Sequence, residues 1–129
     1  MAYNASLTSM DTHPSRTQPV RSFNTTFQPS TDKMCFVTYS IRIQTTLTLT
    51  SGQAGLVQLL IDSFSPPTTV VAQGRSGTTG TLSLTLTHND DYTVVLSAWV
   101  LPGNYVRINT TNVTGTPTFT LERSTEYQF

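Results

Sequence analysis

Apolar and polar residues alternate along much of this chain, and the alternation predicts β-strands. From Cys35 to Ile43 every odd-numbered residue is apolar or aromatic, and Leu47 and Leu49 continue the odd register between threonines. Successive side chains of a strand point to opposite faces, so a period of two indicates a long strand with one buried face and one solvent face. No helical periodicity fits this segment.

Shorter runs of the same character follow, separated by turns rich in Gly, Pro and Asn. The predicted strands are 23–28, 35–50, 56–61, 68–73, 80–87, 92–100, 105–109 and 116–123. No segment between them is long enough for a crossover helix, so the strands are expected to pair antiparallel. The sequence therefore predicts an all-β fold, an antiparallel β-sandwich of the jelly-roll kind.

The apolar positions of these strands define a predicted hydrophobic core. Its members are Val37, Tyr39, Ile41, Ile43, Leu47, Leu49, Val57, Leu59, Ile61, Leu82, Leu84, Leu86, Leu96, Ala98, Val100, Val106, Ile108, Phe119 and Leu121. Cys35 is the single cysteine and is expected to be a small buried side chain of the same strand face rather than a reactive thiol. A chain of 129 residues suits one such core.

The first twenty residues differ in character from the rest of the chain. Pro14 and Pro19 interrupt any regular element there, and few large apolar side chains are present. We expect residues 1–20 to form an extended arm that docks onto another protein, with the sandwich domain over 21–129. The N-terminus has no basic start followed by an apolar stretch, so we expect no secretory signal, and no apolar run is long enough for membrane insertion.

Charge is scarce and balanced. Seven basic and seven acidic residues give a formal net charge of zero, and charged residues make up 11% of the chain. No basic stripe is present, so the sequence offers no electrostatic case for binding nucleic acid. Threonine, with 26 residues, fills the polar strand positions instead. A surface with so little charge suggests that identical copies cover part of it, as in a homo-oligomer.

Groups that carry chemistry are few. His88, Asp90 and Asp91 are the only tight group of possible metal ligands, and an ordinary turn explains them more simply. No glycine-rich nucleotide-binding motif, paired-carboxylate site or cysteine–histidine pair stands out. We therefore expect no enzyme activity and no cofactor. The Thr-x-Thr repeats, such as Thr46–Thr48, are either a flat hydroxyl ladder for binding or simply the solvent face of strands.

Five segments of the chain resemble small structural proteins of tailed bacteriophages, namely tail-fibre and needle-knob proteins. They are RSFNTTFQ at 21–28, FVTYSI at 36–41, LTLTSGQAG at 47–55, VLPGNYVRI at 100–108 and TGTPTFT at 114–120. The resemblance implies a virion protein, commonly trimeric, that is made in the cytoplasm of the bacterial host. The partner onto which residues 1–20 dock is then expected to be another virion protein.

Three functions remain open at this stage. The first is a tail-fibre or knob-like protein that attaches the particle to a glycan or protein on the host surface. The second is a purely structural component, such as a capsid decoration, a head fibre or a tail fitting. The third is a carbohydrate-binding module.

A count of strand reversals predicts where host contact would occur. If every predicted strand reverses direction, the turns at 62–67, 88–91 and 110–115 share one end of the sandwich, and those at 51–55, 74–79 and 101–104 share the other. Loops on a rigid scaffold are common recognition sites, and rings such as Phe64 and Tyr92 often contact ligands. The predicted receptor-binding residues are Phe64, His88, Asn89, Asp90, Asp91, Tyr92 and Asn112.

Overall fold

A computed structural model describes residues 14–48, 51–77 and 88–129 of the chain. Within these ranges the chain forms eight strands and no helix, and hence no helix long and apolar enough to cross a membrane. The strands are β1 (Ser15–Thr17), β2 (Thr26–Phe27), β3 (Cys35–Leu47), β4 (Ala54–Asp62), β5 (Val70–Gly77), β6 (His88–Val100), β7 (Tyr105–Thr114) and β8 (Thr118–Gln128).

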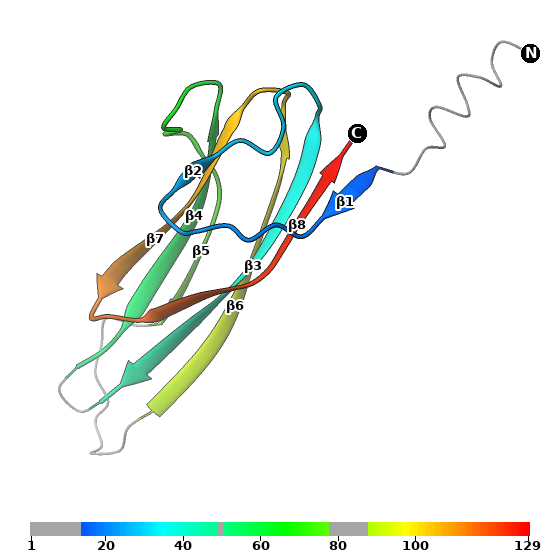
Figure 1. Ribbon diagram of the computed structural model, residues 1–129. Coiled ribbons are helices and arrows are strands. Elements are labelled where there is room, and N and C mark those ends of the chain that lie inside the picture. Colours follow the sequence, from blue (N-terminus) through cyan, green and yellow to red (C-terminus); the bar gives the residue numbers. More distant parts are fainter. Residues whose placement is uncertain (1–13, 49–50, 78–87) are drawn as a thin grey trace, which may run out of the picture.

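The strands form two four-stranded sheets that pack face to face (Figure 1). One sheet has the order β1-β8-β3-β6 and the other the order β2-β7-β4-β5, with every neighbouring pair antiparallel. This interleaved order is that of an eight-stranded jelly roll. The predicted antiparallel sandwich is confirmed.

The hydrophobic core lies between the sheets and follows the predicted alternation. Along β3 the odd residues from Cys35 to Thr45 are buried and the even ones are half-buried. The predicted members that are buried are Val37, Tyr39, Ile41, Ile43, Val57, Leu59, Ile61, Leu96, Val100, Val106 and Ile108. Ala98, Phe119 and Leu121 pack against this cluster while partly exposed.

Other predicted core positions had different outcomes. Leu47 is only half-buried, because it ends β3 at the rim of the sandwich. Leu49, Leu82, Leu84 and Leu86 lie outside the described residues, as does the whole strand predicted at 80–87. Ala54, Leu60 and Val94 are buried although they were not predicted.

Three predicted boundaries are wrong. The segment 88–91 is not a turn, because His88–Asp91 pair with Leu47–Gln44 of β3 and start β6. Likewise β7 continues to Thr114 through pairing with β4, so most of the turn predicted at 110–115 is strand. Cross-strand hydrogen bonding outweighs the local turn preference of Asn and Asp at both places. In the predicted arm, Ser15–Thr17 form β1 against β8, despite the flanking prolines.

The predicted grouping of the turns is also wrong. Gly77 pairs with Ala54 and His88 pairs with Leu47, so β5 ends and β6 begins at the same end of the sandwich. The 62–69 and 101–104 connections therefore share one end, the upper end in Figure 1, whereas the start of β6 and the 115–117 turn lie at the lower end.

Candidate functional site

A row of large side chains crosses the outer face of the β1-β8-β3-β6 sheet near the upper end. Arg16 is paired with Tyr127, Tyr127 with Phe36, and Phe36 with Trp99. Residues directly opposite each other in a sheet project from the same face. Because Val37, the neighbour of Phe36 in the chain, faces the core, the whole row faces away from the core.

The rings of this row enclose a shallow apolar hollow. Pro14, Phe36, Trp99, Tyr127 and Phe129 line a volume of about 340 Å³, and we call these five residues the aromatic surface. The ring centroids of Phe36 and Trp99 are 5.0 Å apart, and those of Trp99 and Phe129 are 5.3 Å apart. Trp99 and Phe129 are each 57% exposed, which is unusual for rings of this size.

Hydroxyl groups form the next row of the same face. Thr125, Thr38 and Ser97 lie opposite one another across three strands, and the Ser97 hydroxyl donates to the Thr38 hydroxyl at 2.9 Å. Thr125 is buried, so a ligand on this face would meet the aromatic rings and then the hydroxyls of Thr38 and Ser97. Within the described ranges no group of three or more His, Cys, Asp or Glu side chains is placed to hold a metal.

A buried charged network lies beneath the aromatic surface. The Arg21 guanidinium donates to both carboxylate oxygens of Glu126, at 2.8 and 2.7 Å, and the Tyr39 hydroxyl donates to Oε2 at 2.8 Å. Arg21 also stacks over the ring of Phe27, with its guanidinium carbon 4.2 Å from the centroid. The network ties β8 to the segment that follows β1 and so fixes the backbone beside Tyr127.

The network also shifts the proton equilibria of its members. Burial lowers the pKa of Arg21, but the hydrogen bonds and negative charge of Glu126 outweigh this effect and raise that pKa above its ordinary value. Burial, together with Glu126, raises the pKa of Tyr39 far above its ordinary value. Burial likewise raises the pKa of the Cys35 thiol above its ordinary value, and the negative charge of Glu126 adds to this effect.

The predicted receptor-binding residues do not come together. Phe64 is 53% exposed at the upper end, in the loop between β4 and β5. His88, Asn89, Asp90 and Asp91 open β6 at the lower end, and Tyr92, also 53% exposed, pairs with Ile43. Asn112 lies in β7 of the other sheet, opposite Gly55. The predicted single end site is wrong, because its members occupy both ends and both sheets.

Part of the predicted set does line a polar groove at the lower end. Asn89, Asp90 and Asp91 line it together with Gln44, Thr45, Thr46, Gln53, Thr116 and Thr118, around a volume of about 570 Å³. The side chain of Asn89 accepts a hydrogen bond from the Thr46 hydroxyl at 3.0 Å. The groove is polar throughout, without an exposed ring, so we give it second place after the aromatic surface.

The loop that carries Phe64 is held by Asp62. The carboxylate accepts hydrogen bonds from the backbone N–H groups of Thr68 and Thr69, at 2.5 and 2.8 Å, and from the Thr69 hydroxyl at 2.8 Å. These bonds stabilise the charged form, and the bond from the Thr68 backbone contributes most to lowering the pKa of Asp62 below its ordinary value.

Loosening of this loop in acid is therefore expected. A depressed pKa in the folded state means that the stabilisation is present above the unfolded pKa and is lost as the pH falls through the folded pKa. The amide signals of Thr68 and Thr69 should titrate together below the ordinary range of an aspartate in a pH series followed by NMR. In an Asp62→Asn variant they should not. Titration at or above the ordinary range would contradict this assignment.

Sequence reasoning missed the aromatic surface, although one signal for it was present. Phe36 occupies an even position in a strand whose odd positions form the core, and Trp99 lies between Ala98 and Val100 in the same way. Rings at solvent-facing positions mark a binding surface. Pro14, Tyr127 and Phe129 had no such signal, because only the pairing of the two termini brings them there.

No protein-family model matches this chain, and no curated protein matches it either.

Proposed function

We propose that this chain is a non-enzymatic virion protein of a tailed bacteriophage, tail-fibre or knob-like, that acts in host attachment. The observation that supports the proposal is the aromatic surface, a cluster of exposed rings on one sheet. An ion pair between Arg21 and Glu126 stabilises the strand that carries Tyr127 and precedes Phe129. Exposed Trp, Phe and Tyr side chains dominate the binding energy of many recognition surfaces. The host-facing partner is a glycan or a protein of the bacterial surface.

Other features agree with this proposal. The resemblance of residues 21–28, 36–41, 47–55, 100–108 and 114–120 is to tail-fibre and needle-knob proteins. The jelly-roll architecture is frequent in viral shell proteins and in lectins, although a fold alone does not establish a function. The low charge fits a domain whose surface is shared among copies, and we propose a homo-oligomer, most simply a trimer.

Replacing Trp99 with alanine is expected to reduce adsorption of the particle to host cells at least tenfold. The reason is that removing a central ring of a binding surface commonly costs about 2 kcal/mol or more. Adsorption is measured as the rate of loss of free particles, and the melting temperature of the isolated domain should stay nearly unchanged because the ring is 57% exposed.

Matched variants locate the contact. Phe64→Ala and Tyr92→Ala each remove a ring of similar exposure away from the aromatic surface, so they should leave adsorption nearly normal. If Trp99→Ala particles adsorb like the wild type while Phe64→Ala or Tyr92→Ala particles adsorb poorly, the aromatic surface is rejected. The contact would then lie at the Phe64 loop or at the start of β6.

A purely structural role is the second candidate, and the same surface favours it in one respect. Leu101 and Val95 are also exposed on or beside this face, so the rings belong to a wider apolar area of the kind that neighbouring subunits cover. In that case Trp99→Ala would leave adsorption intact per particle but reduce the amount of this protein in the particle. A carbohydrate-binding module, the third candidate, would bind soluble glycans outside any particle.

A further inference from the structure

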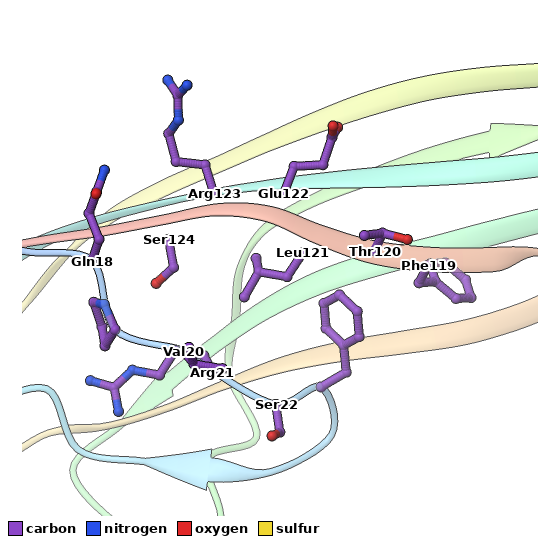
Figure 2. Close-up of a pocket in the computed structure, with 12 residues that line it drawn as sticks. Gln18, Val20, Arg21, Ser22, Phe119, Thr120, Leu121, Glu122, Arg123 and Ser124 are labelled. Atoms are coloured by element: carbon purple, nitrogen blue, oxygen red, sulfur yellow. The ribbon is translucent and has the colours of Figure 1, made fainter.

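A long groove runs along the side of the sandwich where the two sheets are bridged. We call residues 18–23, which lead from β1 in one sheet toward β2 in the other, the strap. The groove lies between the strap and residues Phe119–Ser124 of β8, and its volume is about 820 Å³ (Figure 2). The ion pair between Arg21 and Glu126 holds the strap against β8, so the groove is a stable part of the fold.

One wall of the groove is a strand edge with which no described strand pairs. On one side β8 pairs with β3 along its length, but on the other it pairs with β1 only at Glu126–Gln128. From Thr118 to Thr125 this second edge has no neighbouring strand in the part of the chain that the structure describes. Unpaired N–H and C=O groups along a strand edge are a template for adding another strand.

The groove also has an apolar floor. Phe23, Phe119 and Leu121 are only partly buried where they pack against the core. Figure 2 shows Phe119 and Leu121 on the strap side of β8, whereas Glu122 and Arg123 point the other way. A strand in this groove would cover apolar side chains with one face and leave its other face in water.

A buried hydroxyl in the groove has no hydrogen-bond partner among the described residues. Ser124 is 7% exposed, and its hydroxyl forms no hydrogen bond with any described residue. Its side chain points toward the strap in Figure 2. Buried polar groups in native proteins are nearly always paired, so this hydroxyl can hydrogen-bond to a group that enters the groove.

The N-terminus of the chain has the pattern that such a groove requires. In the segment MAYNASLT, the odd residues Met1, Tyr3, Ala5 and Leu7 are apolar, and all the even residues except Ala2 are polar. This is the period of a strand with one apolar face. Eight residues from Met1 to Thr8 also equal the eight from Thr118 to Thr125 on the open edge.

The direction of β1 decides whose N-terminus reaches the groove. Ser15 pairs with Gln128 and Thr17 with Glu126, so the chain enters β1 at the upper end and runs toward the groove. Pro14 therefore lies beside the C-terminal end of β8, away from Thr118–Thr125. An arm from a neighbouring copy can enter the groove directly, whereas a chain's own arm would first have to reverse past β1.

We propose that residues 1–8 of a neighbouring copy pair as an added strand with the open edge of β8, with Tyr3, Ala5 and Leu7 on the apolar floor. This inference rests on the homo-oligomer of the proposed function and names its linking contact. It gives the arm a second copy of this chain as partner in place of a different virion protein. Glu122 is an extra residue of β8 in the register of the β3–β8 pair, and so forms a bulge. This bulge divides the pairing between β8 and the added strand into two short stretches.

A pair of double variants tests the apolar face of the arm. Tyr3→Asp with Leu7→Asp places two carboxylates on the groove side, and should convert the oligomer into a single chain of 14.2 kDa in light scattering at micromolar concentration. The matched control, Asn4→Asp with Ser6→Asp, adds the same charge on the water-facing side and should keep the wild-type mass. Equal masses for the two variants, or a wild-type protein that is already a single chain, would overturn the inference.

Cross-linking tests the partner and the place. Thr120→Cys on β8 is combined in turn with Asn4→Cys, Ser6→Cys or Thr8→Cys, and the protein is oxidised mildly. At least one combination should give covalent dimers and larger species on a denaturing gel, which Thr120→Cys alone should not. Cross-links only within single chains, or none in any combination, would reject the neighbouring copy. Adsorption of Trp99→Ala particles is measured separately, so host attachment can stand if this contact fails.

Discussion

Replacing Glu126 with alanine is expected to lower the free energy of unfolding by about 3–5 kcal/mol, the usual cost of removing one partner of a buried ion pair. The change leaves the Arg21 guanidinium and the Tyr39 hydroxyl without their shared acceptor. Both would then be partly buried and unpaired, which costs far more than the net value of the pair itself. Urea unfolding followed by circular dichroism measures the loss.

Two companion variants separate the charge from the packing. Glu126→Gln keeps an amide oxygen that can still accept from Tyr39, so its loss should be smaller than that of Glu126→Ala. Arg21→Met combined with Glu126→Leu removes both charges and fills similar volume, and a buried pair replaced in this way is often close to neutral. A loss below about 1 kcal/mol for Glu126→Ala would show that the pair is worth no more than an exposed one.

Replacing Ile41 with aspartate is expected to prevent folding. Ile41 is fully buried at the centre of β3, between Val94 of β6 and Leu121 of β8 in the register of the sheet. An unpaired carboxylate there costs several kcal/mol on top of the lost apolar burial, against a total stability of about 5–15 kcal/mol for a domain. The spectrum of an unfolded chain, or insoluble protein, is the expected observation.

The neighbouring position supplies the control. Ser40 faces the outer side of the same strand, so Ser40→Asp introduces the same charge without burying it. Ile41→Val keeps the site apolar and should cost only about 0.5–1.5 kcal/mol. A folded Ile41→Asp protein with the wild-type melting temperature would mean that the register of β3 is misassigned.

The two stability variants also bear on the aromatic surface. Tyr127 follows Glu126 in β8, and Phe36 precedes Val37 in β3, so the rings stand on the backbone that the core and the ion pair hold. We expect Glu126→Ala to weaken adsorption only where it also lowers the fraction of folded protein. If adsorption falls only in proportion to the fraction of folded protein, Glu126 supports the aromatic surface from beneath and does not itself contact the ligand.

The sequence by itself determined the fold class and most of the core. Alternation along 35–43 identified β3, and its odd residues from Val37 to Ile43 are all fully buried. Such patterns are readable because the direction of a strand side chain depends only on its place in its own strand. The sequence also predicted correctly that Cys35 is buried.

Only the tertiary structure decided which strands are neighbours, and with that the candidate sites. The turn predicted at 88–91 became the start of β6 because β3 pairs with it. The aromatic surface joins Pro14 and Phe129 from the two ends of the chain with Phe36 and Trp99. Strand pairing depends on contacts between residues far apart in the sequence, and the strand and turn preferences of neighbouring residues do not predict those contacts. The direction of each side chain could therefore be predicted from its own strand. The surface that these side chains form depends on β1, β8, β3 and β6 lying side by side.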